Sequence, residues 1–325
     1  MRSAPPHRIQ MTPPDSHGLD ALNTRQADAL AMGGPDRIAR QYEKGRLTAR
    51  ERIATLLEPD SFDELGLLAR SDLPEARDRT PADGKICGYG QIGDRTVAVS
   101  ADDVTVLAGA GGRIGVGKQM ALMAYAQRKG YPMIHLGDAG GARVPDIMGS
   151  DGMTSMVYRI DQPPRDRSIP LLTLIMGECY GGPTWTASVS DIVIQVKGKA
   201  MCVGGPSILE IATGEQATAE ALGGPALHAH TTGLVDLFAD SDEHALQLAR
   251  HCLSYFPSSA RDLPPRGPDL PAGGHTATRA AGHRAHRPAP ALRYASAAGA
   301  GRRHGFSAGT QAQLRRQSDH RVGAH

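Results

Sequence analysis

Short apolar segments that end in glycines and lead into helical segments recur through the middle of this 325-residue chain. We expect a strand in each apolar segment and a helix after most of the glycines. Strands that alternate with helices in this way predict an α/β fold. The segments are "YPMIHLGDAGGARV" (131–144), "SIPLLTLIMGECYGGPTWTASVS" (168–190), "DIVIQVKG" (191–198) and "KAMCVGG" (199–205), with further helices expected over 146–160 and 205–214.

Two of the glycine turns share one design. The first glycine turn, "GDAGGAR" (137–143), and the second glycine turn, "GECYGGP" (177–183), each end an apolar strand and open onto a helix. Backbone N–H groups at such a point have no partner within the helix. If the two turns lie together, these amides can form an oxyanion hole, a set of donors that stabilises a developing negative oxygen. The alternative, that the glycines only permit tight packing of strand against helix, stays open.

The side chains near these turns give a weaker signal. His135, Asp138, Glu178 and Cys179 lie close to the turns in the sequence, but no Ser-His-Asp or Cys-His spacing is diagnostic here. Cys179 fits a core thiol better than a nucleophile. A site made mostly of backbone donors needs a substrate or cofactor that brings its own base.

Two other glycine patterns resemble nucleotide-binding loops. "GGRIGVGKQ" (111–119) nearly spells G-x-x-x-x-G-K-[ST], but Gln119 stands where a hydroxyl must hold Mg²⁺, so a glycine-rich helix entry is preferred over an ATP site. "GYGQIG" (88–93) matches G-x-G-x-x-G, but a strand follows it, whereas the dinucleotide-binding loop requires a helix. It belongs to 84–109, whose alternation around a Gly-Asp turn predicts a β-hairpin.

The amino-terminal part predicts a loose leader over 1–35 and two basic helices over 37–62. In the second helix, Thr48 and Glu51 form a capping box, and Pro59 ends the helix. The helix has one apolar stripe, and its basic residues are expected on a solvated or partner-facing side. The stripe consists of Ile53, Leu56 and Leu57, and the basic residues are Arg46, Arg50 and Arg52.

Charge and composition separate the body from the carboxyl-terminal segment. The net charge is +2, but residues 264–325 carry ten Arg against two Asp, which leaves the rest of the chain at −6. An acidic body argues against a nucleic-acid groove. The Ala, Arg, Gly, His and Pro bias predicts disorder over 259–325 rather than a basic nucleic-acid-binding arm, and leaves 36–258 as the folded domain.

Four dispersed cysteines indicate neither a zinc ribbon nor a disulfide scaffold, and we expect no metal. With no apolar signal segment and no run long enough to span a membrane, the expected location is the cytoplasm.

Over residues 37–258 the chain resembles the β, or carboxyltransferase, subunit of biotin-dependent acyl-CoA carboxylases of the acetyl- and propionyl-CoA carboxylase group. The zinc ribbon of the bacterial acetyl-CoA carboxylase β subunit is missing, which argues against that branch. The resemblance is carried, in order, by "YEKGRLTARERIATLLEPDSFDE" (42–64), "DDVTVLAGAGGRIGVGKQ" (102–119), "GDAGGARV" (137–144), "IMGECYGGPTWTASVSDIVIQV" (175–196) and "GEQATAEALGGPALHAHTTGLVD" (214–236).

The resemblance implies a crotonase-like superhelix of repeated β-β-α units and a site between subunits. It implies an acyl-CoA substrate, biotin carried on a partner protein or domain, a biotin carboxylase or biotin carrier subunit as partner, and a homo-oligomer. Carboxybiotin then supplies both the carboxyl group and the base. The implied oxyanion hole consists of Gly140, Gly141, Ala142, Gly181 and Gly182, and the implied substrate-binding residues are Gly111, Gly112, Arg113 and Arg143.

The sequence departs from the family pattern in three places. Ala139 replaces the Ser of D-S-G-G-A-R, and Pro183 removes an N–H that could have been a further donor. The family's second crotonase-like half is not recognisable after Ser258, and a frameshift in a G+C-rich gene would produce a tail of this composition. We therefore expect the amino-terminal half of a carboxyltransferase. The alternatives are a biotin-linked acyl-CoA decarboxylase subunit, a non-catalytic CoA-binding subunit and, last, phosphoryl transfer at 112–118.

Overall fold

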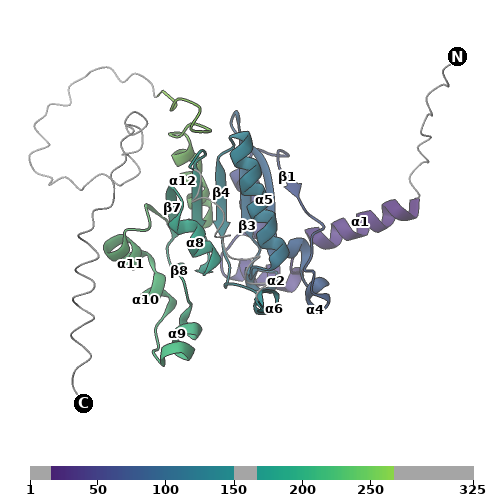
Figure 1. Cartoon of the computed structure of the whole chain (residues 1–325), viewed down its shortest axis with the longest axis horizontal. Helices are drawn as coiled ribbons and strands as arrows, with labels where there is room; N and C mark the ends of the chain where they lie inside the picture. The colour runs from purple at the N-terminus through teal and green to yellow at the C-terminus, as the bar shows by residue number, and fades with distance from the viewer. Residues whose placement is uncertain (1–15, 150–166, 267–325) are drawn as a thin grey trace, which may run out of the picture. The chain divides into compact units, whose positions relative to one another are not determined.

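Two β-sheets organise residues 16–149 and 167–266, the parts of the chain that this computed structural model describes (Figure 1). The larger sheet has seven strands in the order β1-β2-β3-β4-β5-β7-β9; its first three strands are antiparallel and the rest run parallel from β3 onward. The smaller sheet pairs β6 with β8 in parallel. The strands are β1 (Asp63–Leu65), β2 (Lys85–Ile92), β3 (Arg95–Asp102), β4 (Met133–Gly137), β5 (Leu171–Ile175), β6 (Glu178–Tyr180), β7 (Ile192–Val196), β8 (Ala200–Cys202) and β9 (Leu237–Ala239).

The predicted β-β-α repeat is present. Strand β5 is followed by β6 and helix α8 (Gly182–Ser188), and β7 is followed by β8 and helix α9 (Pro206–Thr213). In each repeat the first strand joins the large sheet and the second joins the small one. The predicted hairpin is also confirmed, since β2 and β3 pair from Lys85↔Asp102 to Ile92↔Arg95.

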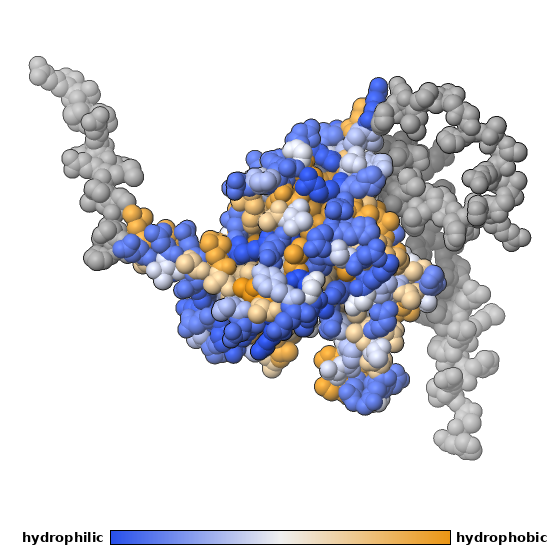
Figure 2. Space-filling model, turned by 180° about the vertical axis from the view of Figure 1, so that it is seen from behind, coloured by the Kyte–Doolittle hydropathy of each residue, from blue (hydrophilic) through white to orange (hydrophobic). Residues whose placement is uncertain are grey.

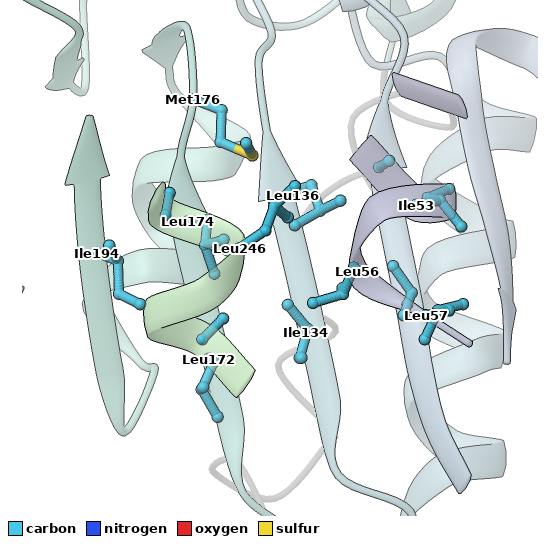
Figure 3. Packing of buried hydrophobic residues seen from close by; sticks show 14 of the residues in the cluster. Ile53, Leu56, Leu57, Ile134, Leu136, Leu172, Leu174, Met176, Ile194 and Leu246 are labelled. Atoms are coloured by element: carbon cyan, nitrogen blue, oxygen red, sulfur yellow. The ribbon is translucent and has the colours of Figure 1, made fainter. Parts of the chain in front are cut away.

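Helices cover both faces of the large sheet. On one face, α5 (Arg113–Lys129) packs Leu122 and Ala126 against Met133 and Leu171. On the other, α3 (Ala49–Leu56) packs on β2 and β3, and α12 (Asp242–Leu253) packs on β5, β7 and β9. Figure 3 shows Leu56 and Leu246 among the strand residues of this buried cluster. Burial of apolar surface contributes about 25 cal/mol per Å² to the free energy of folding, so packing against these two helical layers stabilises the sheet. The other helices are α1 (Ser16–Leu30), α2 (Pro35–Glu43), α4 (Pro74–Arg77), α6 (Val144–Ile147), α10 (Ala219–Gly223) and α11 (Pro225–Leu227), with 3₁₀ turns at Pro81–Gly84 and Leu107–Gly109 and a π turn at His228–Thr232.

The amino-terminal helices confirm one prediction and correct another. The capping box is formed, because the Thr48 side chain accepts from Glu51 N–H while the Glu51 carboxylate accepts from Thr48 N–H. Ile53, Leu56 and Leu57 are buried as predicted. The prediction of a solvated basic side is wrong for Arg52, which is 1% exposed. It lies at the same helical spacing as the apolar stripe, so the fold turns it inward.

The predicted segment boundaries differ from the structure at both ends. Residues 16–30, within the predicted leader, form helix α1, since Ala, Leu, Gln and Arg are favourable helix residues. In the predicted tail, Ala260 N–H donates to Ser168 O at 2.8 Å, and Ser259 N–H donates to the Asp262 carboxylate at 3.2 Å. The rest of the tail from 267, and most of the helix predicted over 146–160, lie outside the described residues. Over the described ranges, no helix is long and apolar enough to cross a membrane.

Gly88 in β2 allows the start of β1 and the residue before it to approach closely. A Cβ at Gly88 would lie 2.3 Å from the Asp63 carbonyl oxygen and 2.7 Å from the Phe62 ring. We predict that Gly88→Ala lowers the free energy of unfolding by about 1–3 kcal/mol, because neither neighbour is free to move away. Denaturant titration followed by circular dichroism measures the change.

Gly117→Ala is the matched control for this substitution. Nothing lies within 4 Å of a Cβ at Gly117, which stands inside α5. It should be neutral or stabilising by up to about 1 kcal/mol, because alanine favours a helix more than glycine does. Equal effects of the two substitutions would contradict the close approach at Gly88.

Candidate active site

The two glycine turns lie against each other. Tyr180 N–H in the second turn donates to the Ala139 carbonyl in the first at 3.0 Å, and Met176 N–H donates to the Gly137 carbonyl at 2.9 Å. Because β4 and β5 are neighbouring parallel strands, their carboxyl ends meet at one edge of the sheet, and both turns leave from that edge. The convergence on which an oxyanion hole depends is therefore present.

A third segment completes this edge. Gly140 N–H donates to the Ala108 carbonyl at 3.0 Å, and Gly111 pairs with the first turn in both directions: Gly111 N–H to Gly141 O at 2.9 Å and Arg143 N–H to Gly111 O at 2.8 Å. The predicted substrate-binding glycine at 111 is thus a direct neighbour of the predicted oxyanion hole.

The five predicted donor positions divide into two groups. The N–H groups of Gly140 and Gly181 are already used, on Ala108 O and on Cys202 O at 3.2 Å. The backbone N–H groups of Gly141, Ala142 and Gly182 donate no hydrogen bond to any residue that the structure describes. Ala142 and Gly182 are exposed and Gly141 is partly exposed, so these three amides are open to a ligand.

Two of the glycines are required by the backbone conformation. Gly141 has φ +118° and Gly181 has φ +68°. Side chains other than glycine rarely adopt such angles. The first turn, which presents the free amide of Gly141, therefore depends on glycine at 141, and the second turn, which presents that of Gly182, depends on glycine at 181.

The near-match to an ATP loop has no room for phosphate. At the amino end of α5, Gly115 N–H donates to the Asp83 carboxylate at 2.6 Å, so a protein carboxylate takes the place of a bound anion. Lys118 Nζ donates to the carbonyls of Ala82 at 3.0 Å and Lys85 at 2.8 Å, and burial lowers the pKa of this amine. The glycine-rich segment is a helix entry packed on 81–85, as the sequence interpretation preferred.

Arg143, the last residue of the first turn, has a buried side chain that pairs with two carboxylates. It is 6% exposed, with Nη2 at 2.6 Å from Asp83 and Nε at 2.5 Å from Asp146. Gly112 makes room for it, because a Cβ there would lie 1.8 Å from Arg143 Nη2. Arg113 pairs with Asp72 at the surface, where its side chain is 37% exposed. Of the two predicted substrate-binding arginines, Arg113 is the accessible one, and Arg143 is committed to carboxylates.

The side chains near the turns are buried beneath them. His135, Asp138 and Cys179 are 1%, 1% and 0% exposed. Burial lowers the pKa of His135 to about 4 and raises the pKa of the Cys179 thiol well above its ordinary value. Glu178 is exposed and accepts from the Tyr180 hydroxyl at 3.3 Å. The side chains of His135, Asp138 and Cys179 are therefore closed off from the surface of the turns, where the free amides and Glu178 are exposed.

No group of His, Cys, Asp and Glu residues in the described ranges could hold a metal ion.

The carboxyl transferase domain family matches residues 40–287. The chain belongs to this family.

Relatives and solved structures of the carboxyltransferase family agree with the fold. The chain is 34% identical over 252 residues to a propionyl-CoA carboxylase carboxyltransferase subunit of Haloferax mediterranei, and 36% identical over 250 residues to a putative propionyl-CoA carboxylase β chain of Bacillus subtilis. Each match covers 76% of this chain and 49% of the relative. The chain thus spans about half the length of the curated relatives it matches.

Among solved structures, transcarboxylase 12S, described as a hexamer with methylmalonyl-coenzyme A bound, superposes with a TM-score of 0.68 at 29% identity over 78% of this chain and 50% of that chain. The β subunit of Pseudomonas aeruginosa geranyl-CoA carboxylase gives 0.60 at 28% identity over 77% of this chain and 46% of that chain. The predicted crotonase-like fold is confirmed.

Sequence reasoning missed Arg52 as a residue that contacts this candidate site. Its guanidinium contacts Asp138 at 2.8 Å and Asp242 at 2.9 Å, and Nη2 donates to the Met176 carbonyl at 3.2 Å. Burial opposes its charge, but the two carboxylates outweigh burial and raise the pKa of Arg52. A signal was present, because a charged residue at an apolar-stripe position implies a buried partner.

The buried imidazole of His135 gives a pH test. Its Nδ1 lies 2.9 Å from the Ser100 hydroxyl, and burial lowers its pKa from 6.5 to about 4. As the pH falls from 6.5 to about 4, the imidazole of His135 is therefore protonated in the unfolded chain before it is protonated in the folded protein. We predict that the free energy of unfolding drops by up to about 3 kcal/mol between pH 6.5 and 4 from this group.

Denaturant titrations at several pH values, with His135→Gln as the control, isolate this contribution. The slope attributable to the imidazole should vanish in the variant. A His135 ring resonance that titrates near pH 6.5 in the folded protein would contradict the assignment.

Proposed function

We propose that this chain is the amino-terminal part of the carboxyltransferase of a biotin-dependent acyl-CoA carboxylase, with an acyl-CoA such as propionyl-CoA or acetyl-CoA as the carboxyl acceptor. One observation carries the proposal. The hydrogen bond from Tyr180 to Ala139 joins two glycine turns that leave the N–H groups of Gly141, Ala142 and Gly182 unpaired and accessible.

In the proposed reaction, these amides hold an oxygen that gains negative charge. Removal of the α-proton of an acyl-CoA turns its thioester carbonyl into an enolate, and donors fixed in advance stabilise the enolate more than the neutral thioester. A single well-placed donor of this kind lowers a barrier by about 3 kcal/mol. Because the donors belong to the backbone, they need no reorientation when the charge forms.

The donor set also fits a biotin-linked partner. When bound, carboxybiotin supplies the carboxyl group and the base. The structure supports an external base, because the imidazole of His135 and the carboxylate of Asp138 are sealed beneath the turns. In the proposed reaction, this chain binds the carbonyl oxygen through the N–H groups of Gly141, Ala142 and Gly182. It also keeps its buried side chains away from the substrate.

The surface around the turns supports a site completed by a further protein surface. Large hydrophobic side chains are exposed on α6, α8, α9 and the loop after β8, and α9 has no buried residue. Figure 2 shows hydrophobic residues on the segment that carries α9. We propose that this face meets a second crotonase-like half or copy in an oligomer, with the biotin carrier entering between them. The residues are Val144, Met148, Trp185, Val203, Ile208 and Ile211.

A decarboxylase is the second candidate. The chain is 29% identical over 245 residues to the methylmalonyl-CoA decarboxylase subunit α of Veillonella parvula. The same amides would then stabilise the enolate left when a carboxyl group departs. Net carboxylation of an acyl-CoA in turnover with a biotinylated partner would favour the carboxylase, and net loss of the carboxyl group from a malonyl-type thioester would favour this second candidate. CoA binding without any exchange would favour a non-catalytic subunit.

Removal of one free amide tests the proposed oxyanion hole. Gly141→Pro deletes an N–H and distorts the turn, so we predict at least a hundredfold loss of carboxyl transfer from carboxybiotin to propionyl-CoA. The assay uses the chain complemented with the carboxyl-terminal half of a full-length relative.

Ala219→Pro is the matched control for Gly141→Pro. This substitution, too, removes one backbone N–H. Residue 219 is the first position of helix α10, which accepts proline, and the preceding Thr218 already has the extended ψ of 157° that proline favours. It should transfer at the unsubstituted rate. Full activity in Gly141→Pro would contradict the site.

The chain on its own should transfer little carboxyl group. The proposed site needs two reactants held together, and loss of one wall of such a site costs on the scale of ~7 kcal/mol or more. Transfer of labelled carboxylate to propionyl-CoA or acetyl-CoA is measured for the purified chain beside a full-length relative. Turnover within tenfold of that relative would show that this chain, as it stands, builds a complete site.

A further inference from the structure

Arg52 links three segments that are far apart in the sequence. From α3, its Nη1 pairs with Asp138 at 2.8 Å, its Nη2 donates to the Met176 carbonyl at 3.2 Å, and its Nε pairs with Asp242 of α12 at 2.9 Å. All three nitrogens of the guanidinium thus have a partner, and the side chain is 1% exposed. A group this buried and this fully paired holds its partners in fixed relative positions.

One of those partners belongs to the first glycine turn, and another directly precedes the second. Asp138 is the second residue of the first turn, and Met176 directly precedes Gly177, the first residue of the second turn. The Asp138 carboxylate lies directly on Gly177, where a Cβ would be 1.7 Å from Oδ1. One buried guanidinium therefore contacts the first turn and the residue directly before the second turn.

The geometry requires arginine rather than any cation. The planar guanidinium directs its donors to two carboxylates and one carbonyl at once, whereas a lysine ammonium is a point charge on a flexible stem. Lysine at position 52 would keep the charge and lose the simultaneous contact to both turns. Arg50, on the same helix, offers the contrast, because it pairs with Glu64 of β1 at 2.7 Å and touches neither turn.

We propose that Arg52 is a positioning residue that fixes the two glycine turns relative to each other and thereby sets the spacing between the free amides of Gly141 and Gly182. Its role in catalysis rests on the proposed function, but its role in the geometry does not. It acts through Asp138 and the Met176 carbonyl and contacts no substrate itself.

Amide hydrogen exchange of the full chain tests the geometric role. In Arg52→Lys, the N–H groups that join the turns to their neighbours, those of Tyr180 and Gly140, should exchange at least tenfold faster, while amides in β5 and β7 stay within threefold. Arg50→Lys, the matched control, should leave all of them within threefold. No acceleration at the turns, or equal acceleration at the turns and in β5 and β7, would overturn the proposal.

Two further measurements keep the result decisive. If Arg52→Lys does not fold, the isosteric Asp138→Asn, which weakens the same contact to the first turn, is judged by the same exchange criterion. The second measurement follows the carbonyl of propionyl-CoA labelled there with ¹³C. Hydrogen bonds from the free amides should shift the carbonyl resonance of the bound ligand relative to the free ligand in the unsubstituted chain, and Arg52→Lys should lose at least half of that shift. A saturating ligand with no shift in the unsubstituted chain would contradict the oxyanion hole, while the exchange result would still decide the role of Arg52.

Discussion

The hydrogen bond between Tyr180 N–H and the Ala139 carbonyl, at 3.0 Å, is the contact on which the site depends. It joins two turns that are forty residues apart, and the parallel pairing of β4 with β5 brings them to the same sheet edge. In the joined turns, the amides of Gly141 and Gly182 donate to no carbonyl of the described residues.

Charged groups buried beneath the turns support this contact. Arg52 pairs with Asp138, whose own N–H donates to Asp102 at 3.2 Å, and Asp102 in turn pairs with Lys85. Buried charges are costly unless every one is compensated, so such a network stabilises one arrangement and penalises others. Arg52, Asp138, Asp102 and Lys85 are thus buried, whereas the amides of Ala142 and Gly182 are exposed where the substrate is proposed to lie.

The sequence was sufficient for the fold and for part of the site. Apolar segments ended by glycines predict an α/β fold because that pattern depends on local residue types, whereas the β-β-α repeat follows from the family resemblance. Which amides stay free could not be predicted, since Gly140 and Gly181 lose theirs to Ala108 and Cys202 through contacts between distant segments. Arg52 is misplaced when Arg46, Arg50 and Arg52 are assigned to one solvated or partner-facing side, because position 52 shares the helical spacing of the buried stripe.

The most direct test of the account is a crystal structure of the chain with a non-hydrolysable acyl-CoA analogue bound. The account predicts the carbonyl oxygen of the analogue at hydrogen-bonding distance, about 2.7–3.1 Å, from the backbone nitrogens of Gly141 and Gly182. An analogue bound with its carbonyl oxygen away from both nitrogens, or turns whose amides have paired with protein carbonyls, would contradict the claim that these turns form the oxyanion hole.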